Sequence, residues 1–489
     1  MTGAMASIMS STIVNVAIPD MSHHFTLGQE RAQWVSSGFM VAMTVSMLTT
    51  PWLLMRYGYR RTYAATMWLL LTGGVVGGVS NNFDVVLLAR VVEGLAAGVV
   101  QPIPAIIILR AFEPHEQGRA MGLFGMVVVL APALGPSIGG VLVDLFGWRS
   151  IFFMVVPFCL VSLWMASRYV PTTAPGGAVG NKDGPTLDWR GLLLASVTTL
   201  GVLNGLVALH DGAYAMAVAL LCSSATALAA FVWWQRRLGL AMLGRSLEGA
   251  VNSSATASGA WQQEPLMNLA LFSHRQFAMG GIVAFIYGTA LFGSTYLIPV
   301  YMQLGLGMSA SSVGTMLLPA GLVLAITIAL VGRLADKQPA YRLVTIGLVL
   351  LAISFALMVT VGLTTSIWVI GIWAIVGRTG LGFVLPSLNL GAMRGLQPDL
   401  IAQAATAINF LRMAGGATGV GLCAIVLEWR LGAHGESLAH PSTNPARLAA
   451  FNESFLMLAA ICALAIVAAW QMRDEMHDEM HDEMRDKST

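Results

Sequence analysis

The chain has 489 residues, of which 56% are hydrophobic and only 10% are charged, and its formal net charge is +2. Soluble domains carry about 25% charged residues, so a soluble enzyme of several domains is excluded, and the small net charge excludes a basic surface for nucleic acid. The four cysteines are scattered through apolar stretches, which predicts neither a disulfide framework nor a metal site. A mean hydropathy of +0.73 is typical of a polytopic membrane protein.

Apolar stretches of about 20 residues, the length that crosses a bilayer, recur along the whole chain. The first has no basic leader and no small-residue cleavage site, so we interpret it as a retained helix rather than a signal peptide. The pattern predicts fourteen transmembrane helices, near 3–20, 33–54, 62–80, 84–107, 120–143, 150–169, 190–209, 213–235, 277–302, 311–332, 341–362, 366–390, 400–427 and 452–471.

The distribution of lysine and arginine orients these helices, because cytoplasmic loops carry an excess of both. With the N-terminus in the cytoplasm, nineteen of the 26 lie in cytoplasmic segments, four in outer loops and three inside helices. This bias requires an even number of helices. It therefore predicts a multi-pass protein of the cell membrane with both termini in the cytoplasm.

A short internal repeat divides the chain, as is usual in transporter folds. The segments Pro51–Arg61 and Gly332–Arg342 start 281 residues apart, and each follows an apolar helix on the cytoplasmic side. We therefore expect two related halves of six helices, with two further helices inserted between them. The predicted parts are an N-terminal bundle (1–170), a linker with the inserted helices (171–235), a cytoplasmic loop (236–276), a C-terminal bundle (277–471) and an acidic cytoplasmic tail (472–489).

Several motifs, in order along nearly the whole chain, resemble those of the major facilitator superfamily, and in particular its fourteen-helix EmrB/QacA-type drug:proton antiporters. The resemblance implies an all-α fold of two six-helix bundles plus two inserted helices. The motifs are STIVNVAIP (Ser11–Pro19), RYGYRR (Arg56–Arg61) with a second copy at Gly332–Lys337, ARVVEGLAAGVVQP (Ala89–Pro102), GMVVVLAPALGPSIGG (Gly125–Gly140) followed by Gly147-Trp148-Arg149, YLIPVYMQ (Tyr296–Gln303) with Pro319, and NFLRMAGGATGVG (Asn409–Gly421).

The chain departs from the family pattern at two positions that usually hold an acid. The first-helix motif normally has an acidic residue just before its Ser/Thr-Ile-Val run, where this chain has Ser10. The first loop motif usually contains an aspartate, where this chain has Met55, whereas the second copy keeps its acid as Asp336. The first-helix substitution raises the alternative of transport that is not coupled to protons.

Ionisable residues inside the predicted helices are costly, at roughly 2.5–3.5 kcal/mol each on insertion scales, so each needs a reason. Glu93 is the one carboxylate well inside a predicted helix, and Arg90 precedes it by three residues, so both project from one helix face. Glu93 could load and release protons or attract a cationic substrate, and the plain alternative is a fixed ion pair. Arg412 could act on Glu93 or contact an anionic substrate group, and its alternative is packing; Arg378 carries the same cost.

Three further groups of residues have candidate roles, each with packing, lipid contact or simple topology as the alternative. In the fifth helix, small residues and a proline favour a helix that seals the contact between the halves. The cytoplasmic loops could form a latch, and polar and aromatic side chains of the second half could line an amphiphile pocket. The gating residues are Gly135, Pro136, Gly139 and Gly140; the latch residues are Arg56, Gly58, Arg60, Gly332, Asp336 and Lys337; the pocket residues are Tyr287, Phe292, Tyr296, Gln303, Asn389 and Asn409.

Together these features predict a secondary active exporter of multidrug or toxic compounds in the inner membrane, not an enzyme. It would work by alternating access and proton antiport, with small amphiphilic substrates, protons and the lipid bilayer as partners and without a cofactor or nucleic acid. No nucleotide-binding loop occurs in the sequence, and the resemblance implies a periplasmic adaptor protein. The alternatives are a transporter of a cell metabolite, uncoupled transport, and a non-transporting membrane sensor.

Overall fold

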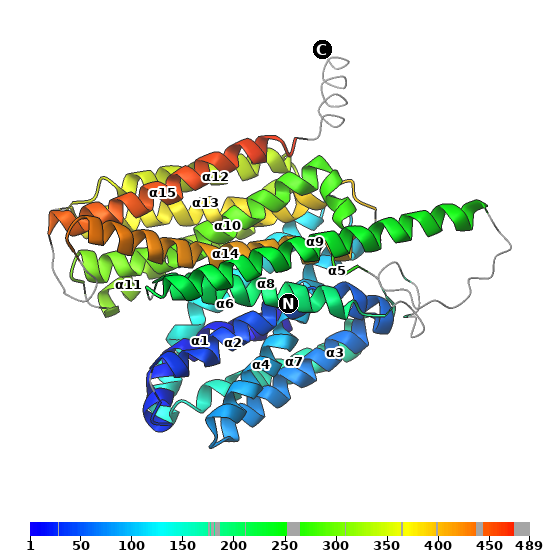
Figure 1. Ribbon diagram of the computed structural model, residues 1–489, viewed down its shortest axis with the longest axis horizontal. Coiled ribbons are helices and arrows are strands. Elements are labelled where there is room, and N and C mark those ends of the chain that lie inside the picture. Colours follow the sequence, from blue (N-terminus) through cyan, green and yellow to red (C-terminus); the bar gives the residue numbers. More distant parts are fainter. Residues whose placement is uncertain are drawn as a thin grey trace, which may run out of the picture. The chain divides into compact units, whose positions relative to one another are not determined.

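A computed structural model describes residues 1–27, 29–174, 177, 180, 186–210, 212–251, 265–308, 310–362, 365–397, 400–436 and 444–473. The chain is built from α-helices (Figure 1). Its first seven helices are α1 (Thr2–His24), α2 (Gln29–Met47), α3 (Thr50–Val79), α4 (Phe83–Val100), α5 (Ile103–Ala111), α6 (Gln117–Phe146) and α7 (Ser150–Tyr169).

The second part of the chain begins with a pair of long helices, α8 (Trp189–His210) and α9 (Tyr214–Val251), which pack along each other. α9 then continues past the end of α8 (Figure 1). The remaining elements are a 3₁₀ turn (Leu269–Ser273), α10 (Arg275–Val300), a π-helical turn (Tyr301–Gly305), α11 (Ala310–Ala335), α12 (Ala340–Met358), α13 (Ile367–Met393), α14 (Ile401–Ala433) and α15 (Pro445–Trp470).

Hydropathy and length account for most of these helices. Eleven of them are long and apolar enough to cross a membrane, with α4 and α5 joined into one span, and three shorter apolar helices lie at Thr2–Ile18, Trp34–Met47 and Gln117–Ala131. The prediction of an all-helical membrane protein is confirmed. The number of fourteen transmembrane helices stays a prediction.

The largest difference from the predicted boundaries lies at the end of α9, which continues to Val251 although the sequence predicts a helix over 213–235 and a loop from residue 236. A second difference lies at the loop motif Pro51–Arg61. The sequence predicts a helix over 33–54 and a loop up to residue 62, but α2 ends at Met47 and α3 begins at Thr50. Pro51 stands in the first turn of α3, where its missing N–H group costs no hydrogen bond. Gly58 has φ +77° and bends the helix inside the motif, a backbone conformation that glycine adopts readily. The apolar run therefore continues past residue 50, although α2 has already ended at Met47.

The described chain separates into two compact units. The first consists of residues 1–113, 123–270 and 397–414, and the second of residues 114–122, 271–396 and 415–489. The start of α6 thus belongs to the second unit and the first part of α14 to the first. Each of these two helices contributes to both units.

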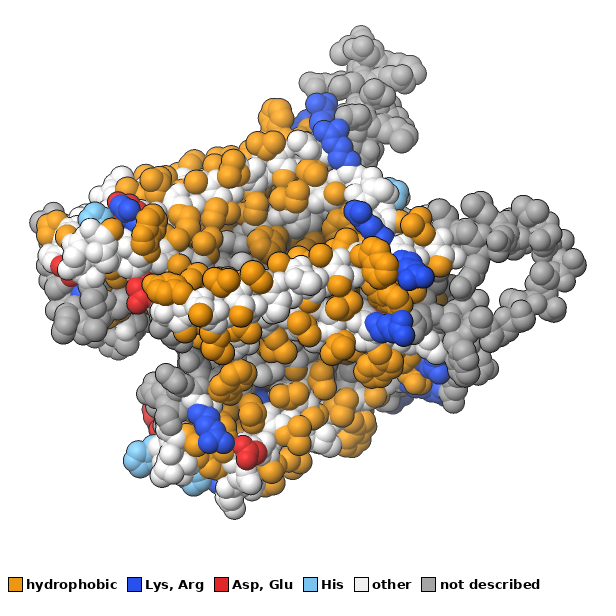
Figure 2. Space-filling model, viewed as in Figure 1, with side chains coloured by type: hydrophobic (Ala, Val, Ile, Leu, Met, Phe, Trp, Pro, Cys, Tyr) orange, Lys and Arg blue, Asp and Glu red, His pale blue; other side chains and the backbone are white. Residues whose placement is uncertain are grey.

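The surface agrees with a membrane environment. In Figure 2, hydrophobic side chains cover the sides of the helices, whereas arginines and lysines lie near helix ends. α8 and α9 keep only 22% of their apolar windows buried, so most of their side chains are left to face lipid. At the start of α8 the buried Asp188 accepts hydrogen bonds from Gly191 N (2.8 Å), Trp234 Nε1 (2.9 Å) and Gln235 Nε2 (2.7 Å). This carboxylate ties the two helices together at one end.

Candidate functional site

The centre of the first unit holds a buried ion pair on α4. Asn82 caps this helix by accepting from Asp84 N, and the regular turns that follow bring Arg90 and Glu93 onto one face. Arg90 Nη1 lies 2.5 Å from Glu93 Oε2, and the two residues are 2% and 0% exposed. An unpaired charge at such a depth would be strongly unfavourable, so the pair explains how both residues are tolerated.

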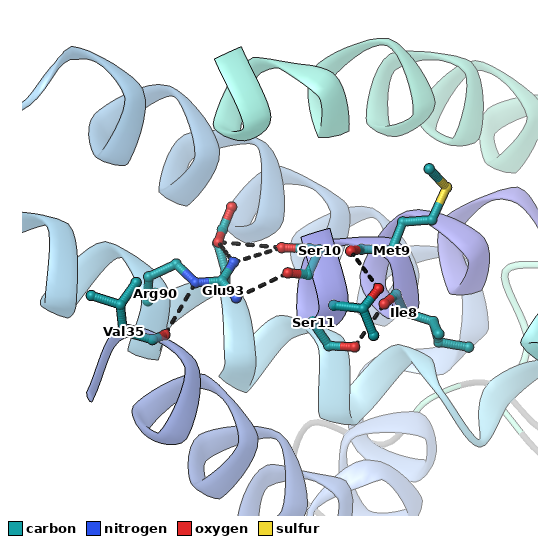
Figure 3. Close-up of polar contacts among 8 residues, drawn as sticks. Ile8, Met9, Ser10, Ser11, Val35, Arg90 and Glu93 are labelled. Atoms are coloured by element: carbon teal, nitrogen blue, oxygen red, sulfur yellow. Dashed lines mark hydrogen bonds and ion pairs between the residues drawn. The ribbon is translucent and has the colours of Figure 1, made fainter. Parts of the chain in front are cut away.

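Ser10 of α1 completes this pair (Figure 3). Arg90 donates from Nη1 to Ser10 Oγ at 2.7 Å and from Nη2 to the Ser10 carbonyl oxygen at 3.0 Å. Ser10 Oγ in turn donates to Glu93 Oε2 at 3.5 Å. The position that holds an acid in the family pattern is therefore in direct contact with both charges of α4. From the sequence alone, position 10 is recognised only as a missing acid, because its partners Arg90 and Glu93 lie 80 and 83 residues away.

α2 supplies the other contacts of the guanidinium group. Arg90 Nε donates to the Val35 carbonyl oxygen at 3.3 Å (Figure 3), and the Phe39 ring lies 4.2 Å from the guanidinium carbon. All three nitrogens of Arg90 thus have acceptors, and a ring face covers the group as in other cation–π pairs. Three helices hold this arginine in one place.

The Glu93 carboxylate is bound less completely. Its Oε1 is buried and, within the described part of the chain, has no hydrogen-bond partner. α3 leaves room for the side chain with two glycines: a Cβ at Gly73 would lie 2.6 Å from Glu93 Cγ, and one at Gly74 would lie 3.2 Å from Oε1 and 2.9 Å from the Phe152 carbonyl oxygen. A buried acceptor without a bond costs about 1–3 kcal/mol. Among the described residues, Oε1 is therefore the unsatisfied atom of this carboxylate.

Arg412 and Asn409 lie together on the part of α14 that belongs to the first unit. Arg412 is buried and donates from Nη2 to Asn409 Oδ1 at 2.8 Å, and Asn409 donates to the Ala405 carbonyl oxygen. Met413 packs against the cluster of Phe39, Met43 and Ala97. The ion pair of Glu93 is made with Arg90 rather than with Arg412. α14 instead contacts the Phe39 cluster through Met413, and the Phe39 ring in turn packs on Arg90.

The glycines of the predicted gating helix lie on α6 and face α1. A Cβ at Gly135 would be 2.5 Å from Thr12 Oγ1, and one at Gly139 would be 2.6 Å from Ile13 Cγ1. Gly140 has more space, and the side chain of Pro136 lies outside the described residues. α6 therefore packs closely on the helix that carries Ser10.

The second copy of the loop motif binds the beginning of α6. Asp336 accepts from Gly118 N at 2.6 Å and from Arg119 N at 3.0 Å, as an acidic cap does at a helix N-terminus. Gly332 faces Gly118 and Gly122 so closely that a Cβ on it would lie 2.5 Å from Gly122 Cα. All these residues belong to the second unit. The next residue after Asp336, Lys337, donates from its backbone N–H group to the Leu334 carbonyl oxygen.

The first copy of the motif has different partners. Tyr59 N donates to Thr173 O at 3.0 Å and Arg60 Nε to Val170 O at 2.7 Å. A Cβ at Gly58 would lie 2.6 Å from Thr172 O, and the Arg56 guanidinium stacks over Trp52 at 5.4 Å. The segment that follows α7 therefore binds this part of α3 through its main-chain carbonyl groups. The sequence does not indicate this contact.

The predicted pocket residues divide between the units. Tyr287, Phe292 and Tyr296 lie on α10, Gln303 in the π-helical turn and Asn389 on α13, all in the second unit, whereas Asn409 lies in the first. Tyr287 is fully buried. The role of these residues as a pocket stays a prediction.

Comparisons with known proteins agree with this architecture. The family model described as Major Facilitator Superfamily matches residues 1–420. The chain is 23% identical to an uncharacterized MFS-type transporter, YcnB, of Bacillus subtilis, covering 97% of this chain and 93% of that protein. It is 24% identical to a lincomycin resistance protein, LmrB, of Listeria innocua (86% and 83% covered) and 26% identical to a multidrug resistance protein B homolog of Mycobacterium tuberculosis (89% and 76% covered).

Solved structures share the fold at low sequence identity. A crystal structure of the human organic anion transporter MFSD10 has a TM-score of 0.61 at 15% identity, covering 96% of this chain and 97% of that one. The proton:xylose symporter XylE has the same TM-score at 13% identity, covering 96% and 93%. The relatives are transporters and resistance proteins rather than enzymes. The chain is therefore a membrane transporter that belongs to the major facilitator superfamily.

Proposed function

We propose that the protein exports multidrug or toxic compounds by proton antiport, as an EmrB/QacA-type transporter of the inner membrane with fourteen helices and both termini in the cytoplasm. The names of relatives as lincomycin and multidrug resistance proteins support the substrate class. Substrate would bind between the two six-helix bundles, which alternate in access. A periplasmic adaptor belongs to the proposal through the family resemblance alone.

The observation that carries the proposal is the Glu93 carboxylate, which is fully buried with one oxygen paired to Arg90 and the other without a hydrogen bond. A proton bound at Oε1 would neutralise the carboxylate and weaken its attraction to Arg90. Arg90 would still have Ser10 and Val35 as acceptors. Protonation would thus weaken the ion pair within α4 and the contact of Glu93 with Ser10 of α1, while Arg90 keeps acceptors in α1 and α2.

Ser10 has a specific place in this mechanism. Because position 10 touches both Arg90 and Glu93, an acid at either position 10 or position 93 can face the same arginine. We propose that Glu93 takes over the task of the missing first-helix acid. Helix α6, with Gly135 and Gly139 against α1, would transmit the movement, and Asp336 at the start of α6 would act as the cytoplasmic latch.

The test compares Glu93→Gln with Asp84→Asn in a pump-deleted host, on a susceptibility panel that includes lincomycin. Both changes remove one carboxylate from α4, but Asp84 is 76% exposed at the helix start. We expect Glu93→Gln to abolish resistance and proton-driven efflux at unchanged expression, and Asp84→Asn to keep both. The double variant Ser10→Asp/Glu93→Gln should regain efflux driven by a pH gradient in vesicles. Full resistance in Glu93→Gln would remove this residue from the mechanism.

The vesicle assay also separates the alternatives. An uncoupled transporter, which the serine at position 10 would favour, moves substrate equally with and without a pH gradient. A metabolite transporter shows substrate-dependent proton flux but no resistance phenotype. A non-transporting sensor shows no substrate-dependent proton flux in any variant.

A further inference from the structure

Arg378 is the feature of the second unit that the proposed mechanism does not use. It lies eleven residues after the start of α13 and fifteen before its end, which places it near the middle of the span. Within the described part of the chain, its one hydrogen bond runs from Nη2 to Thr295 Oγ1 at 3.5 Å. In the described ranges, no carboxylate forms an ion pair with it, whereas Arg90 and Arg430 pair with Glu93 and Glu453.

The surroundings of Arg378 are polar on one side. Thr295 lies on α10 and Arg378 on α13, so the two helices meet at this contact. The Thr295 hydroxyl donates to Leu291 O at 2.7 Å and can therefore only accept from Arg378. Thr295 is exposed and Arg378 partly exposed. A guanidinium group inside a span faces water or a partner rather than lipid, so this polar patch is open to a ligand.

We propose that Arg378, at its contact with Thr295, binds the anionic group of the transported compound, a carboxylate, sulfonate or phosphate on an apolar body. The planar fork of arginine forms two parallel hydrogen bonds with such groups, and apolar residues of α10 and α13 supply the contact for the rest of the molecule. A bound oxyanion gives Arg378 the counter-charge that its own unit does not provide. The inference rests on the proposed export function and names its substrate class.

The charges inside the spans agree with this preference. Glu93 is neutralised by Arg90 within hydrogen-bond distance, so it presents no net negative charge to a substrate. Arg378 adds a positive charge that no acid of the described residues balances within ion-pair distance. An anionic compound is therefore favoured over a cationic one. A membrane phospholipid also carries a phosphate, but its head group lies at the membrane surface rather than near the middle of a span.

The experiment measures binding to the full-length protein in phosphatidylcholine nanodiscs, with 8-anilinonaphthalene-1-sulfonate as the amphiphilic anion and ethidium as the cation. We expect Arg378→Gln to weaken anion binding about tenfold or more, the usual effect of losing hydrogen bonds to a charged group, without weakening ethidium binding. Arg378→Lys should lose less, because it keeps the charge but not the fork. Arg342→Gln, which removes an exposed arginine near the start of α12, is the matched control.

Several results would overturn the inference. They are an unchanged anion affinity in folded Arg378→Gln, an equal loss for both probes, or a wild type that binds ethidium but not the sulfonate. Loss of the sulfonate site in discs with phosphatidylglycerol would assign Arg378 to a lipid head group instead. If Arg378→Gln does not fold, Thr295→Val provides the test, with a selective few-fold loss of anion affinity expected because Thr295 accepts the hydrogen bond of Arg378. Glu93→Gln should bind the anion normally, so failure of proton coupling is distinguishable from failure of this site.

Discussion

Removing the carboxylate of Asp336 should release the first turn of α6. The carboxylate accepts from Gly118 N at 2.6 Å and Arg119 N at 3.0 Å. Each charge-assisted bond contributes about 1.5–3 kcal/mol when buried, but Asp336 is partly exposed, so we reduce this to roughly 1 kcal/mol for each bond. The sum of about 2 kcal/mol corresponds to a factor of about 30 in the local opening equilibrium.

Hydrogen–deuterium exchange of the peptide over 114–122 measures this effect directly, because amide exchange reports local opening. Asp336→Ala should accelerate exchange at Gly118 and Arg119 about 30-fold, and Asp336→Asn, which keeps one acceptor, should lie between. Asp144→Ala is the matched control, since Asp144 is exposed near the other end of the same helix. Wild-type exchange rates in Asp336→Ala, or an equal acceleration in Asp144→Ala, would refute the proposed capping contact.

Two further predictions concern other contacts of the first unit. Asp188→Ala leaves three donors without their acceptor, which costs about 1–3 kcal/mol for each buried group. Trypsin should therefore cleave after Arg237 at least several-fold faster. An unchanged cleavage rate would contradict the role of Asp188 in holding α8 and α9 together. Phe39→Leu removes the ring that covers the Arg90 guanidinium, a contribution of about 2 kcal/mol when desolvated. Efflux and thermal stability should both fall in Phe39→Leu, whereas the control Met40→Leu in the same cluster should keep both. Equal effects of the two substitutions would argue against the contact of Phe39 with Arg90.

The sequence predicts the helices well where hydropathy changes sharply. The helix expected at 150–169 is observed at Ser150–Tyr169, because polar or turn-forming residues flank an uninterrupted apolar run. The helix expected at 33–54 is wrong at its C-terminal end, because the apolar run continues into Pro51, which starts α3. Hydropathy detects the membrane but not the short turn at which one helix gives way to the next.

The candidate site shows the same division between local and distant information. Spacing on one helix is enough to predict that Arg90 and Glu93 pair, as they do at 2.5 Å. The contacts of Ser10 with that pair and of Arg60 with Val170 join residues 80 and 110 positions apart. No local pattern encodes such separations, because they depend on how whole helices and connections pack.

The contact between α1 and α4 has a consequence for how such chains are classified. Ser10, Arg90 and Glu93 touch one another, so a change at one of these positions alters the surroundings of the other two. A motif search confined to the first helix scores the serine as the loss of a functional group. Scoring the three positions as a single unit instead asks whether an acid faces the arginine at all, whichever helix contributes it.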